Sequence, residues 1–150
     1  MSARTGVGWT VWGMGPMFLL TWLVGSATAT PPVPTLAPSN HDTEERVLVK
    51  MRARQFEPTM VTLHAGQKTR LVFQNYDAEL HAFVPIGLFA GVSLNISGNG
   101  APEFDHEGFK RVIIPSEGRA EILFVPERTG TYPFLCDMPG HEMRATIVVQ

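Results

Sequence analysis

The chemistry in this sequence centres on one cysteine and on a histidine that follows it closely near the C-terminal end. Cys136 is the only cysteine of the chain, and the residues Asp-Met-Pro-Gly separate it from His141. A Pro-Gly pair usually reverses the chain, so we expect the imidazole to return to the neighbourhood of the thiol. A thiolate and an imidazole on one tight loop suit a soft or borderline metal ion. They make half of a metal site, and the other ligands must come from a distant segment.

The missing ligand is expected from His81, which begins a short apolar run after Asn75-Tyr-Asp-Ala-Glu-Leu. Two imidazoles and one thiolate, with a weak axial thioether, are the ligand set that suits a mononuclear copper ion. Structural zinc usually takes four strong ligands, often with paired cysteines, which a chain with one cysteine cannot supply. A dinuclear copper centre with two bridging thiolates is excluded for the same reason. The sequence therefore predicts a single copper ion.

Short strands must position these ligands. Over residues 46–54 apolar side chains alternate with mostly charged ones, and this period of two indicates a half-buried strand. The apolar positions are Val47, Val49, Met51 and Ala53. Further strands are predicted at Met60–His64, Thr69–Asn75, His81–Pro85, Arg111–Ile114, Arg119–Val125, Thr131–Leu135 and Ala145–Val149, with turn-rich breaks between them.

These elements predict an all-β fold. Each strand has a single apolar face that a second sheet must cover, so we expect an antiparallel two-sheet β-sandwich of about seven to eight strands. No segment shows a sustained helical period. The stretch from Ile86 to Phe109 is long for a plain connection, and we expect it to be a functional loop or to contain a short helix.

The same segments resemble the cupredoxin, or blue copper protein, family, to which azurin, plastocyanin and rusticyanin belong. The resemblance covers residues 46–150. It rests on three features, which are the Asn75 to His81 segment, the strand ending in Cys136 with its Pro-Gly-His141 turn, and the final strand Ala145–Val149. The resemblance implies a Greek-key β-sandwich that holds one copper ion cycling between Cu(I) and Cu(II).

The axial ligand departs from the pattern of the family. In most members the axial methionine follows the second histidine after two to four residues, whereas here only Glu142 separates His141 from Met143. Met143 is the first choice because it lies on the same loop. The alternatives are Met138, a backbone carbonyl near Leu80 and the carboxylate of Glu79.

The N-terminal part has the features of a secretory signal peptide or an N-terminal anchor, which we place at residues 1–29. A basic residue precedes an apolar run from Val7 to Val24, and small residues follow it. Residues 30–45 are rich in proline and fit an extended linker, which leaves residues 46–150 for the cupredoxin domain. The sequence thus predicts a periplasmic or otherwise exported protein, bound to a membrane only if the N-terminal segment is retained. A bound metal accounts for an unpaired cysteine in such an oxidising compartment.

The expected function is electron transport between redox partner proteins, not catalysis. By the resemblance, electrons pass through the exposed edge of His141, and partners dock transiently near it. The expected docking residues are Met138, Pro139, Pro85, Ile86, Leu88 and Phe89. A formal net charge of −2 shows no basic footprint for nucleic acid.

Two other functions use the same residues. A periplasmic copper chaperone or storage protein would hold the ion with the same ligands and pass on the metal instead of an electron. A thiol enzyme would use Cys136 as its nucleophile with a histidine as the base, but no orienting third residue is evident in the sequence.

Overall fold

The structure is a computed structural model that describes Gly8 and residues 43–150. The predicted signal segment, apart from Gly8, and most of the predicted linker therefore lie outside the described residues. The described part is all-β, with eleven strands and no helix. The strands are β1 Glu45–Arg52, β2 Gln55–Glu57, β3 Met60–Leu63, β4 Thr69–Asn75, β5 His81–Pro85, β6 Asn95–Gly98, β7 Ala101–Asp105, β8 Gly108–Ile114, β9 Arg119–Phe124, β10 Gly130–Leu135 and β11 Arg144–Val149.

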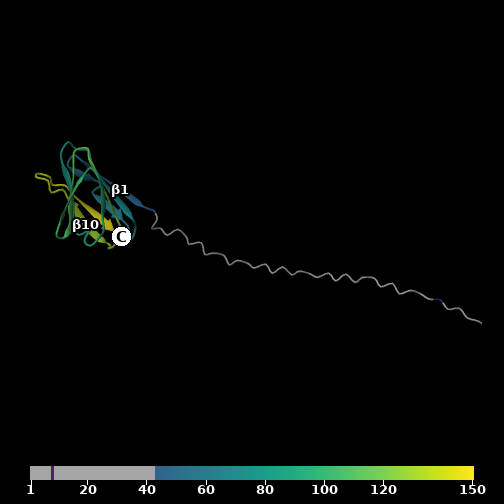
Figure 1. Cartoon of the computed structure of the whole chain (residues 1–150). Helices are drawn as coiled ribbons and strands as arrows, with labels where there is room; N and C mark the ends of the chain where they lie inside the picture. Colours follow the sequence, from purple (N-terminus) through teal and green to yellow (C-terminus); the bar gives the residue numbers. More distant parts are fainter. Residues whose placement is uncertain (1–7, 9–42) are drawn as a thin grey trace, which may run out of the picture. The chain divides into compact units, whose positions relative to one another are not determined.

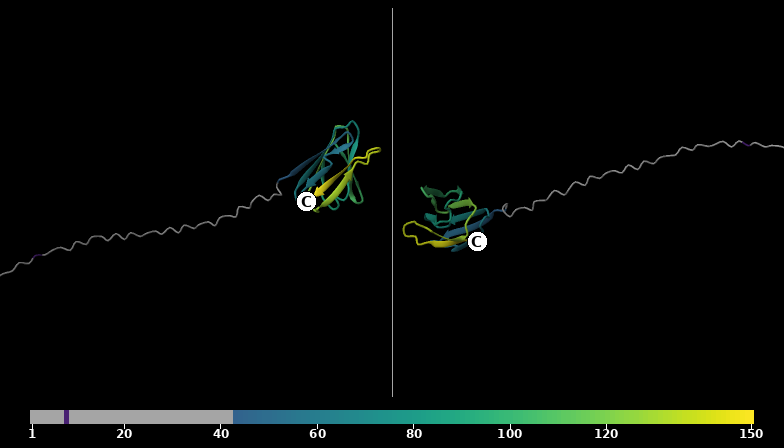
Figure 2. Two further views of the ribbon diagram at one scale, coloured as in Figure 1. Left: turned by 180° about the vertical axis from the view of Figure 1, so that it is seen from behind. Right: turned by 90° about the horizontal axis from the view of Figure 1, so that it is seen from below.

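The strands form two sheets, which confirms the predicted all-β sandwich. One sheet has the order β2-β1-β4-β9-β6, and the other has the order β3-β11-β10-β5-β8-β7. Figures 1 and 2 show the last two strands, β10 and β11, side by side in yellow, with their connecting loop at one end of the domain. In the described part of the chain, no helix has the length and apolar character that a membrane crossing requires.

Two of the strand pairs are parallel, so the expectation of a purely antiparallel sandwich is wrong. β1 pairs with β4 and β3 pairs with β11 in parallel, while the other pairs are antiparallel. Between β1 and β4 the chain crosses into the second sheet to form β3. When it returns to the first sheet, β4 runs in the same direction as β1. A parallel pair needs a crossover connection of this kind.

All eight predicted runs are strands, with ends that differ by a few residues, and the structure adds β2, β6 and β7. The prediction of a loop or short helix over residues 86–109 is therefore wrong, because this stretch contains β6 and β7. Both strands are largely exposed, and for this reason their sequences carry no clear apolar alternation. Ala53 also departs from its predicted inward position, since it lies exposed in the turn between β1 and β2.

Buried aromatic side chains fill the space between the sheets next to the ligands. Phe134 lies 4.8 Å from Phe56 and 5.3 Å from Phe83 between ring centroids, and Phe83 stacks on Phe73 at 4.1 Å. Phe134 precedes Cys136 by two residues, and Phe83 follows His81 by two. Since alternate residues of a strand share one face, the aromatic core supports the same ends of β5 and β10 that carry the ligands.

Candidate metal centre

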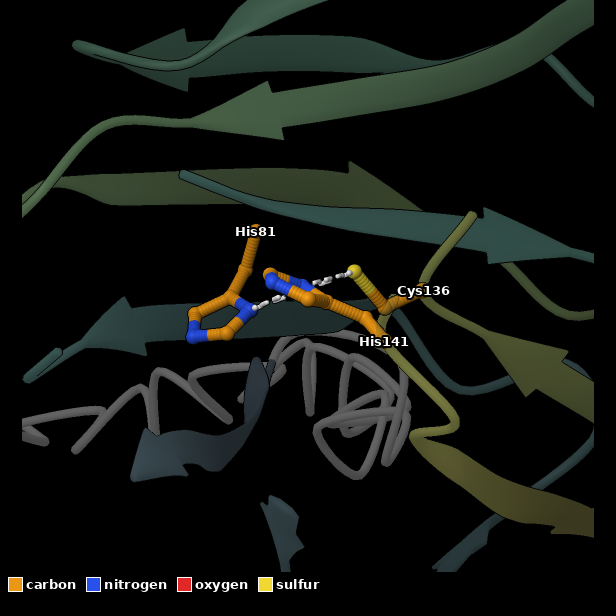
Figure 3. Close-up of side chains that lie close together, drawn as sticks. All are labelled: His81, Cys136 and His141. Atoms are coloured by element: carbon orange, nitrogen blue, oxygen red, sulfur yellow. Dashed lines mark hydrogen bonds between the residues drawn. The ribbon is translucent and has the colours of Figure 1, made fainter. Parts of the chain in front are cut away.

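Three neighbouring elements bring His81, Cys136 and His141 together. His81 is the first residue of β5, Cys136 follows the last residue of β10, and His141 lies in the loop between β10 and β11. The two Nδ1 atoms are 3.1 Å apart, and the Cys136 Sγ lies 3.4 Å from His141 Nδ1 and 3.9 Å from His81 Nδ1. Figure 3 shows both rings and the sulfur directed toward one another. The structure thus brings together all three ligands predicted from the sequence, as one of two metal-capable groups in its described part.

The size of this triangle fits a metal ion. Bonds of the length known for zinc sites, about 2.0 Å to nitrogen and about 2.3 Å to sulfur, place trigonal donors about 3.5 to 3.8 Å apart. The observed separations of 3.1, 3.4 and 3.9 Å are close to that range. Both the number and the softness of the donors agree with a single copper ion.

The carboxylates beside the outer Nε2 atoms of the two rings also favour a cation at the inner Nδ1 atoms. His81 Nε2 lies 2.8 Å from Asp77 Oδ2, and His141 Nε2 lies 3.4 Å from Glu79 Oε2. A carboxylate at Nε2 favours the tautomer with its proton on that nitrogen, which leaves a lone pair on Nδ1. Two lone pairs facing each other at 3.1 Å repel unless a proton or a metal ion lies between them. A metal ion between them would satisfy both nitrogens, so the arrangement suits a metal site.

Asn75 holds the segment that carries both carboxylates. Its buried side chain donates to the backbone oxygens of Glu79, Ile114 and Pro115, and its Oδ1 accepts the N–H of Asp77. These bonds tie the connection between β4 and β5 to the end of β8. The approach to His81 is thus fixed by hydrogen bonds as well as by packing.

The sulfur of Cys136 is also held. The backbone N–H of Ala82 donates to Sγ at 3.2 Å, and the Cys136 N–H donates to the Met143 carbonyl at 3.1 Å. Met143 is buried beside the cluster, while Met138 is only partly buried against the core. His81, Cys136, His141 and Met143 form a cluster that resembles a type 1 copper site, in which a weak axial methionine accompanies two imidazoles and a thiolate. Glu79 is not placed to be the axial ligand, because its carboxylate faces the outer Nε2 of His141.

An ion-pair network stabilises the loop that follows Cys136. Arg111 on β8 contacts Asp137 at 2.7 Å through Nη1 and Glu103 at 2.7 Å through Nε. Glu103 belongs to β7, so the hairpin of β7 and β8 supports the residue next to the cysteine ligand. The pKa of Glu103 lies below its usual value because of its hydrogen bond from Arg111.

The carboxylates behind the histidines are both favoured in their charged forms. The hydrogen bonds from Arg54 are the main reason why the pKa of Glu79 falls to about 2. Burial opposes the ionisation of Asp77, but hydrogen bonds from the N–H groups of Arg54 and Ala53 and from His81 together lower its pKa. Both groups are therefore anionic acceptors at neutral pH.

The exposure of His141 and of the docking residues differs from what the sequence predicts. The His141 side chain is only 5% exposed, because Glu79 lies over its outer nitrogen, and so it does not present an open edge. Of the expected docking residues, Leu88 and Phe89 are buried in the core at 5% and 8% exposure, and their place in a docking patch is corrected. Met138 is partly buried, whereas Pro139 is exposed.

Sequence reasoning assigned no role of their own to Asp77, Asn75 or Arg54. Asp77 lies only four residues before His81, the one local signal for a carboxylate partner. Arg54 lies more than twenty residues away in sequence from both carboxylates that it contacts. Only the pairing of β1 with β2 and with β4 brings it to the site.

Comparisons with known proteins agree with this fold. The chain matches the family model described as "Cupredoxin-like domain" over residues 16–149. Auracyanin A, a "blue" copper protein of the green thermophilic photosynthetic bacterium Chloroflexus aurantiacus, is 18% identical, with a TM-score of 0.55, and the match covers 72% of this chain and 100% of that one. An auracyanin of Roseiflexus castenholzii is also 18% identical, with a TM-score of 0.53 and coverage of 70% and 96%. Among curated proteins no match is found.

Proposed function

The chain belongs to the cupredoxin family, and on that premise we propose that it is an exported carrier of single electrons with one copper ion. The proposed ligands are His81, Cys136 and His141, with Met143 in the axial position. The observation that carries the proposal is the convergence of two Nδ1 atoms and one sulfur while both Nε2 atoms face carboxylates. Blue-copper proteins named in the comparisons have the same fold.

A bound copper ion supplies a one-electron couple, and the protein supplies a site that stays constant in both oxidation states. His81 is fully buried and hydrogen-bonded to Asp77, and the Cys136 sulfur accepts the Ala82 N–H. Ligands held in this way move little when the charge of the ion changes. Little movement means a low barrier to electron transfer, which favours a carrier over an enzyme.

We place the docking of redox partners at the end of the sandwich near His141. Pro139 and Gly140 are exposed there, and Leu80, next to Glu79, is half exposed. A small patch of this kind suits a transient encounter, for which interfaces are typically below about 1,200 Å². The apolar segment near the N-terminus supports export to the periplasm, with membrane attachment if that segment is kept.

The test is visible absorption of the copper-loaded protein beside a Cys136→Ser variant. We expect an intense thiolate-to-Cu(II) charge-transfer band that disappears in the variant, because serine offers no thiolate. Glu142→Gln is a matched control on the same loop and should keep the band. A wild-type protein without any charge-transfer band would refute the copper-thiolate site.

A second measurement separates electron transport from copper delivery. A carrier keeps its metal through repeated oxidation and reduction, and a chaperone or storage protein releases Cu(I) to a competing chelator. We expect retention, since His81 is fully buried and His141 is nearly so. Rapid loss of Cu(I) to the chelator, with the band intact in the oxidised state, would favour the copper-handling alternative.

A further inference from the structure

The turn between β1 and β2 contacts both carboxylates that stand behind the ligand histidines. The backbone N–H groups of Ala53 and Arg54 donate to the two carboxylate oxygens of Asp77 at 2.8 and 3.0 Å. The Arg54 side chain donates from Nε and Nη2 to the two oxygens of Glu79 at 2.5 and 2.7 Å. One residue, Arg54, thus holds the partner of His81 through its backbone and the partner of His141 through its guanidinium.

The conformation of this turn is unusual for its residues. Arg52 pairs with Gln55, so Ala53 and Arg54 form a two-residue hairpin loop, and their φ angles are 51° and 56°. Such a loop favours Asn-Gly, because a side chain with a β-carbon is strained at positive φ. Strain of this kind persists where the surroundings fix it, and it is concentrated at functional sites. Here Asp77 fixes it by capping both N–H groups.

The contacts have a direct consequence for the ligands. A guanidinium that donates to both oxygens of a carboxylate fixes its position and plane, and Oε2 of Glu79 lies 3.4 Å from His141 Nε2. A carboxylate at that nitrogen keeps the proton there and directs the Nδ1 lone pair inward. Asp77 does the same for His81 at 2.8 Å.

We propose that the Ala53-Arg54 turn is a clamp that positions the metal ligands, with Arg54 acting on His141 through Glu79. Arg54 and Glu79 are positioning residues, since neither faces the donor triangle. The role of the clamp in tuning the redox potential rests on the proposed copper function. Its effect on the tautomer of the His141 ring does not depend on that function. The clamp is therefore testable both in the metal-free protein and in the loaded one.

The first experiment is nitrogen NMR of the His141 ring in the metal-free protein, at a pH at which free imidazole is neutral. We expect Glu79→Ala to shift the His141 population from the Nε2–H tautomer toward Nδ1–H, relative to the wild type. Glu79→Gln keeps an acceptor oxygen and should restore most of the wild-type pattern. Glu142→Ala, on the exposed carboxylate next to His141, is the matched control and should leave the ring unchanged.

The second experiment measures copper affinity and redox potential of the loaded variants. Loss of a hydrogen-bonding partner behind a metal ligand typically weakens metal affinity about 10- to 100-fold. If Cu(II) affinity falls tenfold more than Cu(I) affinity, the potential rises by about 59 mV. We expect this rise in Glu79→Ala and in Arg54→Gln, and not in Arg52→Gln, which removes a neighbouring exposed charge.

Combining the two substitutions tests whether Arg54 acts through Glu79. In the Glu79→Ala background, Arg54→Gln should add little to either readout, because its partner is already absent. The clamp is overturned if Glu79→Ala changes the tautomer no more than Glu142→Ala does, or if the two substitutions add fully. Absence of the charge-transfer band in the wild type would instead refute the copper function, while an altered tautomer in metal-free Glu79→Ala would still support the clamp.

Discussion

Met143 is the single residue from which we expect the most direct control of the redox potential. The weak axial ligand tunes the redox potential of such a site. Its loss leaves three ligands, a coordination number that Cu(I) accepts more readily than Cu(II), so the potential should rise. Met143→Leu conserves volume and should cost less than about 1.5 kcal/mol of unfolding free energy. Cyclic voltammetry should therefore show a higher potential for a variant that still folds.

Met138→Leu is the matched comparison for this prediction. Met138 is only partly buried against the core, and its substitution should leave the potential near that of the wild type. A rise in Met138→Leu with no change in Met143→Leu would reverse the assignment of the axial ligand.

The histidines illustrate how a residue depends on its outer neighbours. His81 and His141 have similar inner geometry, but Asp77 contacts one at 2.8 Å and Glu79 contacts the other at 3.4 Å. Glu79 is also the more exposed of the two carboxylates. His141 is therefore the ligand whose setting responds more readily to change at the surface.

At the scale of elements, the aromatic core holds the ligand-bearing ends of β5 and β10. Phe134→Ala removes a fully buried ring that contacts Phe56, Phe73 and Phe83. We expect a loss of about 3 to 5 kcal/mol in the free energy of unfolding, measured by urea denaturation. The variant should also broaden the charge-transfer band, because the Cys136 strand loses its support.

Phe104→Ala serves as the control for this prediction. Phe104 lies on β7 with 62% of its surface exposed, so its loss should change stability by no more than about 0.5 kcal/mol. Equal losses in the two variants would contradict the assignment of the core.

At the scale of the whole molecule, copper binding should stabilise the folded state. A ligand present at 100 times its Kd and bound only by the folded protein adds about 2.7 kcal/mol. The thermal unfolding midpoint of the wild type should be higher at a fixed copper concentration than in the metal-free protein. In Cys136→Ser this gain should shrink, and an equal gain there would mean that copper binds elsewhere.

Acid should destabilise the domain through its paired carboxylates. Hydrogen bonds from Arg70 and from Arg111 are the main causes that hold the pKa values of Glu44 and Glu103 below the usual range. A carboxyl group whose pKa is lowered by folding contributes stability that is complete above its unfolded value of about 4.3. This stability is lost as the pH falls through the lower, folded value.

Urea unfolding midpoints over a pH series test this prediction. The urea midpoint should be steady near neutral pH. It should decrease once the pH drops below the pKa of the carboxyl groups in the unfolded chain, about 4.3. Arg70→Met should weaken the acid response, since Glu44 then loses its main hydrogen-bond donor. An acid response as steep in Arg70→Met as in the wild type would show that other groups cause it.

The sequence by itself identified the three residues that the structure brings together, His81, Cys136 and His141, and the eight main strands. Cys136 and His141 are close in sequence with a turn between them, and strands with one buried face carry an alternation that can be read directly. Both of these signals are local. His81 lies 55 residues before Cys136, and it was joined to the other two by the ligand set that a copper ion needs and by the family resemblance. The fold class followed from the same pattern.

Only the tertiary structure decided the surroundings of the site. β6 and β7 are held by backbone hydrogen bonds and are mostly exposed, so their side chains carried no apolar signal. The contacts of Arg54 with Asp77 and Glu79 span more than twenty residues and depend on which strands pair. The pattern of charged residues in a sequence does not show which of them form ion pairs. For this reason the burial of His141 by Glu79 and the role of the Ala53-Arg54 turn could be seen only in the folded chain.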